Sequence, residues 1–436
     1  MISSSPTAAT RYLAPLFRKR LMPLRRLWRK RSINMAKTQY DIAIIGGGLI
    51  GTSLALALAS TPTKIALINR QQSDSRQHQS FDQRAIALSH FSVRRLQQLG
   101  IWESVAAEAT PIKAIHVSDR GHFGTTRISA ATERVEALGY VAAAAALGRA
   151  LQQLPPLSVE RIAPVEAEEL EFEGESNRIH LTPLTGEPFT IQARLVVIAD
   201  GGGSYFSDRL GLTKIAYTYH QQALTTTVTT HLPHQFCAYE RFTNEGPIAL
   251  LPYGNRADSC DWSLVWTQPD SQQPPRINLD DNDFLQQLQQ RFGRRAGHFT
   301  AVGQRDSYPL TLRYLPQAVA PRTLFIGNAS HTIHPIAGQG FNLGLRDVDT
   351  LTALLKPQLQ QGSDPGDPAL LHHYQSLRRS DHWRVIGTTH LLSKLFGHQG
   401  AACGALRSKG LAILDNLPSL RRPFTHQMMG YHYERL

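Results

Sequence analysis

Three glycines in the stretch Gly46-x-Gly48-x-x-Gly51 constrain the fold of this chain more than any other feature. They follow the apolar run 41–45 and precede the Leu- and Ala-rich run 52–60, which predicts a buried strand, a tight turn and a buried helix. The apolar run 64–69 predicts a second strand, and the three elements complete a right-handed βαβ unit. Residues 42–59 are uncharged and have about the length of a bilayer span. This stretch contains four glycines in the pattern of a tight turn, which a membrane-spanning helix does not need, so we expect no transmembrane segment.

In this context the glycines match the fingerprint of a dinucleotide-binding loop. Gly46 permits the tight turn, Gly48 lets the backbone approach a pyrophosphate, and Gly51 allows close packing of helix on strand. The phosphates would lie at the N-terminus of the helix. The second strand ends in Asn69, where an acid usually binds the ribose hydroxyls. We therefore expect the adenosine half to be held without that charge.

A second glycine-rich segment, residues 327–347, predicts another backbone cradle for anions. It follows the apolar run 323–327 and contains Gly338, Gly340 and Asn342 ahead of an apolar helix start. Two such cradles on one sheet suit a long, bent ligand better than a small one.

Two histidines of this segment, His331 and His334, are three residues apart, but no carboxylate or cysteine stands at a helpful spacing. We expect no metal site, and we interpret His334-Pro335 as a rigid wall beside the ligand.

A third signal is Asp200-Gly201, directly after the apolar run 194–200. An acid at the carboxyl end of a parallel strand lies on the ligand side of an α/β sheet. Its alternative role is a helix cap or an Asx-turn.

The remaining patterns predict an α/β fold: a Rossmann-like nucleotide-binding domain with an inserted mixed β-sheet domain and a helical C-terminal tail. β-type alternation in 112–128 and again in 213–266 indicates that two separate segments build the inserted sheet. We predict the boundaries as follows: a basic leader, 1–38; the nucleotide-binding domain, 39–111, 140–212 and 320–364; the inserted sheet, 112–139 and 213–319; and a helical region, 365–436.

The formal charge of +12 comes mainly from the leader, whose 38 residues hold ten basic side chains and no acid. Residues 39–436 carry only +2, which gives no argument for binding nucleic acid. The leader fits an organelle transit peptide, a lipid-binding basic arm, or an extension ahead of a start at Met35. The three cysteines have no metal-ligand or disulfide spacing, so a reducing compartment such as the cytoplasm is expected.

The three motifs, in this order and at these separations, resemble those of the FAD-dependent aromatic hydroxylases of the para-hydroxybenzoate hydroxylase type. Further stretches resemble one branch of that family, the ubiquinone-biosynthesis hydroxylases. These stretches are residues 81–88, 116–122, 240–243, 246–252 and 327–347. The resemblance covers roughly residues 40–436 and leaves the leader unmatched.

The resemblance implies an enzyme that uses FAD, NAD(P)H and molecular oxygen to hydroxylate a polyprenylated (methoxy)phenol through a flavin C(4a)-hydroperoxide. It implies that Arg84 reaches the FAD and that Asp200 and Gly201 serve both FAD and the nicotinamide. It also implies that residues 327–347 contact the ribityl–pyrophosphate region and flank the isoalloxazine; the candidates there are Gly327, Asn328, Pro335, Gly338, Gln339, Gly340 and Asn342. His334 is a candidate catalytic base by position only.

Three positions depart from the family pattern: Asn69, the alanine run 142–146 at an expected helix start, and Gly202-Gly203. Weaker FAD retention is one expected consequence. Two alternatives therefore stay open, a dehydrogenase or reductase of the same fold and a flavin-free scaffold in a quinone-biosynthesis complex. The tail from Leu391, with Leu392, Leu395, Phe396 and Leu406 beside Lys394, Arg407 and Lys409, suggests peripheral contact with the inner membrane; packing on the nucleotide-binding domain is equally compatible.

Overall fold

The computed structural model describes residues 39–71, 84–122, 124–153, 158–202, 205–397, 410, 413 and 415–431. The expectations for the leader, for residues 81–83, and for Leu406, Arg407 and Lys409 lie outside these ranges. None of the helices in these ranges combines the length and apolar character needed to cross a membrane.

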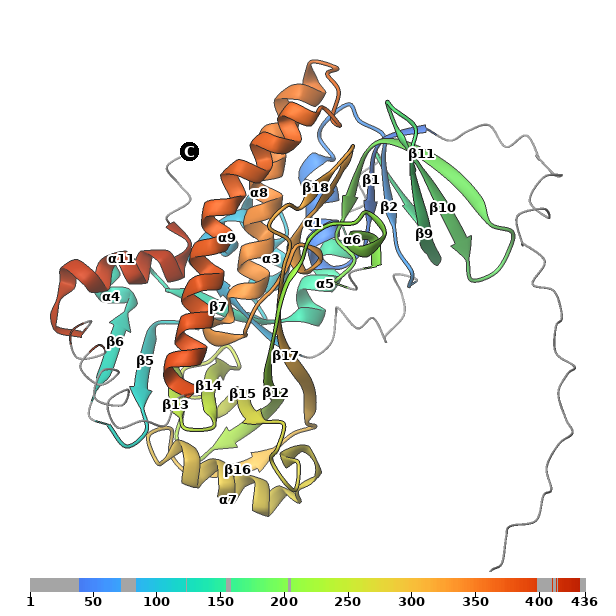
Figure 1. Cartoon of the computed structure of the whole chain (residues 1–436). Helices are drawn as coiled ribbons and strands as arrows, with labels where there is room; N and C mark the ends of the chain where they lie inside the picture. Colours follow the sequence, from blue (N-terminus) through green and yellow to red (C-terminus); the bar gives the residue numbers. More distant parts are fainter. Residues whose placement is uncertain are drawn as a thin grey trace, which may run out of the picture. The chain divides into compact units, whose positions relative to one another are not determined.

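The first sheet carries the glycine-rich loop and has β1 at its centre (Figure 1). β1 runs parallel to β2 on one side and to β11 on the other. β2 also runs parallel to β8, and β11 runs parallel to β19. Among the described residues this sheet has eight strands: β1 (Gln39–Ile45), β2 (Ile65–Ile68), β8 (Val159–Ile162), β9 (Val165–Phe172), β10 (Asn177–Pro183), β11 (Phe189–Ile198), β18 (Val319–Ala320) and β19 (Thr323–Phe325).

Both faces of this sheet are covered, which explains why the paired segments 42–45 of β1, 65–68 of β2 and 195–198 of β11 are apolar throughout. Ile42 and Ile44 of β1 pack among helices, while Ala43 and Ile45 pack against the β9–β10 side. The helices around the first face are α1 (Leu49–Leu58), α2 (His90–Gln98), α3 (Trp102–Ala106), α5 (Ala144–Gln152), α8 (Gln339–Gln360) and α9 (Pro368–Gly397); α6 (Tyr205–Arg209) lies on the second.

The second sheet has nine strands in the described part of the chain, with β20 and β6 at the ends of its order. Apart from β20, its strands come from 114–129 and 215–314. They are β5 (Ala114–Asp119), β6 (Thr125–Ser129), β12 (Ile215–Thr230), β13 (Cys237–Thr243), β14 (Gly246–Tyr253), β15 (Asp261–Pro269), β16 (Phe299–Val302), β17 (Asp306–Tyr314) and β20 (His331–Thr332). The β-type alternation expected over 112–128 and 213–266 covers the strands of these two segments except β16, β17 and the ends of β6 and β15.

One face of the second sheet packs against α7 (Asp281–Phe292), which begins where the side chain of Asp280 accepts a hydrogen bond from the Asp283 N–H. Phe284, Leu288 and Phe292 of this helix pack on Trp262 and Trp266 of β15, among other residues of one buried cluster. The opposite face is therefore the one available to a ligand.

A small third sheet contains β3 (Ala85–Ser89), β7 (Gly139–Ala143) and β4 (Thr110–Ile112). The remaining elements are α4 (Ala130–Glu133), α11 (Pro418–Met429) and the 3-10 turns η3 (Arg276–Asn278), η4 (Gly327–Ala329) and η5 (Ile336–Gly338).

The predicted fold class is confirmed, with corrections to individual elements. α1 begins at Leu49, not at Thr52, because the helix starts directly after Gly48. The alanine run 142–146 does not simply open a helix, since Ala143 ends β7 and Ala144 begins α5. Residues 90–106 contain two separate helices, α2 and α3. The domain boundaries stay a prediction.

Candidate active site at the junction of the two sheets

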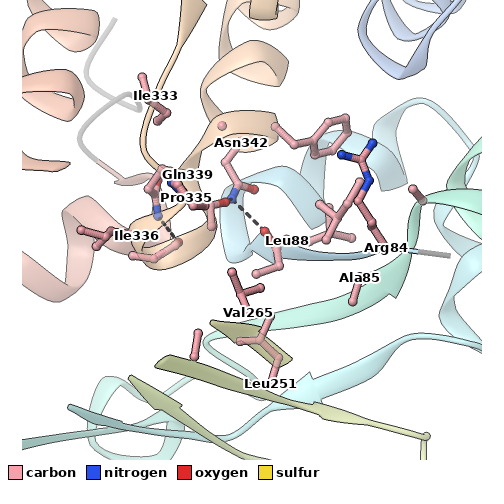
Figure 2. Close-up of a pocket in the computed structure, with 18 of the residues that line it drawn as sticks. Arg84, Ala85, Leu88, Leu251, Val265, Ile333, Pro335, Ile336, Gln339 and Asn342 are labelled. Carbon is pink, nitrogen blue, oxygen red and sulfur yellow. Dashed lines mark hydrogen bonds between the residues drawn. The ribbon is translucent and has the colours of Figure 1, made fainter. Parts of the chain in front are cut away.

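A cavity of about 1930 Å³ lies between the glycine-rich loops and the free face of the second sheet. Figure 2 shows Leu251 and Val265 projecting from that sheet toward the side where Arg84, Pro335 and Gln339 lie. Ligand pockets for small molecules measure about 300–1,000 Å³, so this cavity has room for a large cofactor together with a substrate.

The first glycine loop lines the cavity and has no room for a side chain at two of its glycines. Gly46 has φ +117°, and a Cβ there would lie 2.3 Å from the carbonyl oxygen of Ala199. A Cβ on Gly51 would lie 1.9 Å from the carbonyl oxygen of Gly46. Gly48 caps α1 without a side-chain hydrogen bond, and the first turn of α1 holds no acid. The free N–H groups of this turn therefore remain available to an anion in the cavity.

The second glycine segment supplies another helix start at the same cavity. Gly338 is the N-cap of α8 with φ +60°, no side chain caps the helix, and its first turn holds no acid. Asn328, Pro335, Gln339 and Gly340 also line the cavity; Gly327, with φ +58°, packs against Ile50 beside it. The structure thus brings together the two backbone cradles predicted from the sequence.

Asn342 lines the cavity, but its side chain is fully used within the protein. Its Nδ2 donates to the carbonyl oxygens of Ala87 (2.9 Å) and Gly338 (2.8 Å). Its Oδ1 accepts from the Ser89 N–H (2.9 Å) and the Ser92 hydroxyl (2.7 Å). Asn342 therefore ties the start of α8 to β3 and α2.

Asn69, Arg84, Asp200 and Gly201 also line the cavity. The Nδ2 of Asn69 donates to the carbonyl oxygen of Gln71 at 2.7 Å. Surrounding protein raises the pKa of the Asp200 carboxyl by desolvation, and a hydrogen bond from the Gly202 N–H opposes this shift. These positions are compatible with their expected cofactor contacts, which stay predictions.

His334 has no place in the cavity lining, although its chain neighbours Ile333 and Pro335 do. It is fully buried and meets the ring of Tyr219 edge-on at a centroid distance of 4.9 Å. Burial, and then the nearby His390, lower the pKa of His334 to about 4. A direct catalytic contact of His334 stays a prediction.

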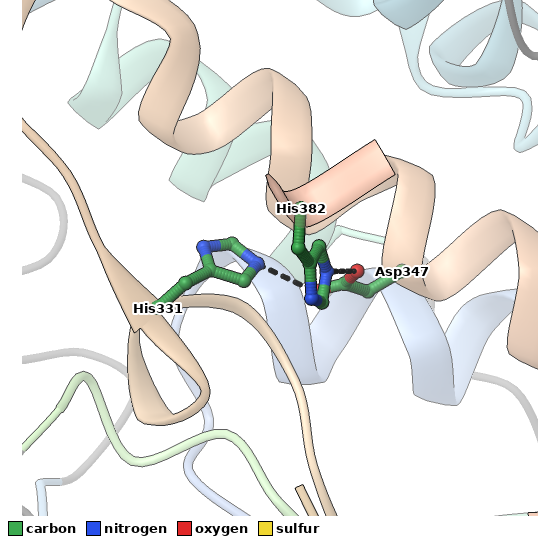
Figure 3. A group of neighbouring side chains, drawn as sticks. All are labelled: His331, Asp347 and His382. Carbon is green, nitrogen blue, oxygen red and sulfur yellow. Dashed lines mark hydrogen bonds and ion pairs between the residues drawn. The ribbon is translucent and has the colours of Figure 1, made fainter. Parts of the chain in front are cut away.

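A buried network behind the second cradle involves residues that sequence spacing does not connect. Asp347 of α8 accepts hydrogen bonds from His331 Nε2 (2.7 Å) and His382 Nε2 (2.8 Å), as Figure 3 shows, and from Arg378 Nε (2.7 Å). It also accepts from the N–H of Gly327 at 2.9 Å.

The two histidines and the carboxylate lie close enough to be considered as metal ligands. Arg378 already places a positive charge on this carboxylate, so we assign the group to a hydrogen-bond network. Burial would raise the pKa of Asp347, but His382, Arg378 and His331 hold it well below its ordinary value. His331 and His334 are three residues apart in the chain, but the structure places them in different surroundings.

Known proteins resemble this chain in sequence and in fold. Residues 39–389 match the family described as FAD binding domain. The chain is 34% identical over 400 residues to the ubiquinone hydroxylase UbiL of Rhodospirillum rubrum, which covers 89% of each chain. It is 30% identical over 409 residues to the 3-demethoxyubiquinol 3-hydroxylase of Escherichia coli, covering 91% of this chain and 100% of the relative.

Among solved structures, p-nitrophenol 4-monooxygenase PnpA of Pseudomonas putida shares the fold with a TM-score of 0.73 at 16% identity, over 90% of this chain and 99% of the other.

The chain belongs to the FAD binding domain family, and it is an FAD-dependent monooxygenase. Within this class it lies in the branch of aromatic hydroxylases whose named members act in ubiquinone biosynthesis, as expected from its motifs. The site fits FAD, since two helix starts without side-chain caps lie at one cavity and the positions of Gly46 and Gly51 have no room for a Cβ.

Proposed function

We propose that this protein hydroxylates the ring of a polyprenylated (methoxy)phenol in ubiquinone biosynthesis, with NAD(P)H and molecular oxygen as co-substrates. The 327–347 segment is specific to the ubiquinone-biosynthesis branch, and the chain resembles the 2-octaprenyl-6-methoxyphenol hydroxylases of that branch. The observation that supports this proposal is a single cavity bounded by two anion cradles at one side and a largely apolar sheet face at the other.

Bound FAD would supply the oxygen chemistry that no side chain can provide. The start of α1 would hold the pyrophosphate, with Arg84 and Asn69 beside the cofactor. Pro335 and the start of α8 would flank the ring system, with Gly327 and Asn328 behind. Asp200 and Gly201, which line the cavity, would serve both FAD and the incoming nicotinamide.

The opposite wall of the cavity would hold the substrate ring and exclude water from it. Ile115, Ile128, Leu138 and Leu251 make part of this wall apolar, and Phe424 and Met428 of α11 extend it. A long prenyl chain needs such a surface and an exit toward a membrane or a partner protein. We propose a cytoplasmic enzyme in peripheral contact with the inner membrane, or a mitochondrial one if the leader is a transit peptide.

The test is incorporation of oxygen-18 from labelled O₂ into a short-chain methoxyphenol by the purified, FAD-loaded protein with NADPH. The expected result is one labelled oxygen per product and faster bleaching of the flavin bands when the phenol is present. Bleaching without labelled product would identify a dehydrogenase or reductase instead. A folded protein that takes up no FAD would support the scaffold alternative.

A further inference from the structure

One row of side chains crosses the cavity face of the second sheet, and Glu240 lies in it. Strand pairing aligns Thr126 with Val117, Val117 with Glu240 and Glu240 with Ala249, and the row continues through Val265 and Thr225 to Asp306. Every member of this row lines the cavity. Side chains alternate along a strand, so Glu240 shares this face with Ala238 and Phe242.

The surroundings of Glu240 on this face are apolar. Phe242 and Ile336 are buried there, and Val117, Leu392 and Leu395 pack against them. The C-terminal end of α9, which carries the two leucines, reaches β13 and β14 (Figure 1). No hydrogen bond or ion pair of the Glu240 carboxylate occurs among the described residues, so the cavity is the place where its partner can bind.

Three of the described lining residues carry carboxyl groups: Asp200, Glu240 and Asp306. Asp306 is exposed, and the Asp200 carboxylate accepts from the Gly202 N–H at 3.2 Å, whereas Glu240 is half-buried. Burial raises the pKa of Glu240 to about 7. A base with this pKa is suited to proton transfer near neutral pH.

Charged groups on the neighbouring elements have partners of their own. Asp119 of β5 lies opposite Phe242 and pairs with His122. Lys394 and His390 of α9 contact Tyr217 and Tyr219. Two arginines, Arg70 and Arg84, also line the cavity. They lie before and after the segment that follows β2, on the side of the glycine loops. Asp306 lies four strands away along the row. The state of Glu240 should therefore respond mainly to what binds in the cavity.

We propose that Glu240 is the residue that accepts the ring hydroxyl of the substrate and takes its proton during hydroxylation. The inference rests on the proposed function and names a catalytic residue for it. The phenol O–H bond breaks, the proton moves to a carboxylate oxygen of Glu240, and the electron pair stays on the ring oxygen.

The electron-rich ring carbon then forms a C–O bond to one atom of O₂, and the other atom leaves as water with two electrons supplied by NAD(P)H through FAD. The attacked carbon loses its hydrogen as a proton to solvent, and Glu240 returns its proton to the ring oxygen. The sum is one phenol, O₂, NAD(P)H and H⁺ giving the hydroxylated phenol, water and NAD(P)⁺.

The first experiment compares the FAD-loaded wild-type protein with Glu240→Gln, using 2-methoxyphenol as the probe. Because the base must be ionised, wild-type kcat/KM should rise as the pH passes through about 7. General-base catalysis contributes about 10²–10⁴-fold. The Gln variant should therefore lose about this factor at pH 8 and show no rise.

The second readout needs no turnover. Without NAD(P)H, calorimetry in buffers of different ionisation heat measures the protons released when 2-methoxyphenol binds. A phenol donating to a carboxylate favours its ionised form, so wild type should release protons near and below pH 7, and Glu240→Gln should not. Glu103→Gln, which removes an exposed carboxyl on α3, should match wild type in both measurements.

A Glu240→Gln variant that keeps the wild-type pH profile and proton release would overturn the inference. If this variant does not retain FAD, Glu240→Asp replaces it; that variant should keep both pH effects with weaker binding, and their absence would equally refute the role. Wild-type protein that releases protons through Glu240 but incorporates no oxygen-18 would contradict the proposed function while leaving the contact of Glu240 with the phenol in place.

Discussion

At the scale of single residues, backbone conformation and burial decide what each side chain of the site can do. Gly46 and Gly51 are required because a Cβ would overlap backbone atoms. Asn342 looks like a cofactor ligand in the sequence, yet all four of its hydrogen bonds are made to protein groups. Glu240 receives its distinctive surroundings from strand pairing rather than from its sequence neighbours.

Gly46→Ala should abolish FAD retention. The new methyl group would lie 2.3 Å from the Ala199 carbonyl oxygen, at a φ of +117° that L residues rarely adopt. Gly100→Ala is the matched control, since Gly100 also has a positive φ, +71°, but open space around its Cβ position. The control should lose only about 1–2 kcal/mol from backbone strain. Flavin absorbance per protein and the melting temperature distinguish the two variants.

His334→Phe should make stability less sensitive to acid. Burial lowers the folded-state pKa of His334 from 6.5 to about 4. Between these values the unfolded chain binds a proton and the folded chain does not, so stability is complete above pH 6.5 and falls toward pH 4. At pH 5 the loss from one such histidine is about 2 kcal/mol.

Urea unfolding at pH 7 and pH 5 measures this difference, and the exposed His372→Phe is the control. An unchanged difference in His334→Phe would contradict the assignment. The same variant tests the catalytic role, because normal hydroxylation would exclude His334 from the reaction.

At the scale of elements, the site depends on contacts between segments that are distant in the chain. The strand–loop–helix units around both glycine segments were predictable, because each is encoded by adjacent residues: an apolar run, then glycines, then an apolar helix. The network of His331, Asp347 and His382 was not predictable, because it requires α9 to pack on α8. Register likewise places Glu240 opposite Val117 and Ala249, and no local pattern specifies that pairing.

Asp347→Asn should destabilise the second cradle strongly. The carboxylate accepts from four donors, and its loss removes one of the two carboxylates that pair with buried Arg378, the other being Asp381. Breaking a buried ion pair in this way costs about 3–5 kcal/mol.

The control is Asp364→Asn, which removes a half-buried carboxylate paired with Arg322; a loss of about 1 kcal/mol is expected there. Denaturant midpoints of the FAD-loaded proteins measure both losses. Equal losses would mean that the network around Asp347 adds nothing beyond an ordinary ion pair.

At the scale of the whole molecule, the C-terminal helices connect the cavity to the surface. The sequence predicted a tail with leucines and basic residues but could not tell which leucines face inward. Leu392 and Leu395 line the cavity, as do Phe424 and Met428 of α11. Leu391 is 63% exposed, and Leu417, directly before α11, is 46% exposed. The helices that close the cavity therefore also present apolar side chains to solvent.

Replacing these exposed leucines should weaken binding to membranes if the prenyl chain enters here. Arg422 is exposed on α11, so apolar and basic side chains occur together on these helices, a combination that favours anionic lipid surfaces. The double variant Leu391→Glu, Leu417→Glu removes two apolar contacts and adds two negative charges. Binding to vesicles with anionic lipid should fall about tenfold or more, since each charge near such a surface changes the free energy by about 1 kcal/mol.

Leu184→Glu provides the matched control, because Leu184 is 73% exposed but lies between β10 and β11, away from the C-terminal helices. Sedimentation with vesicles should show normal binding for this variant. The double variant and Leu184→Glu should both turn over 2-methoxyphenol at the wild-type rate, because a short substrate needs no membrane. Equal vesicle binding by the double variant and wild type would exclude the C-terminal helices as the membrane contact and assign the prenyl exit to another side of the cavity.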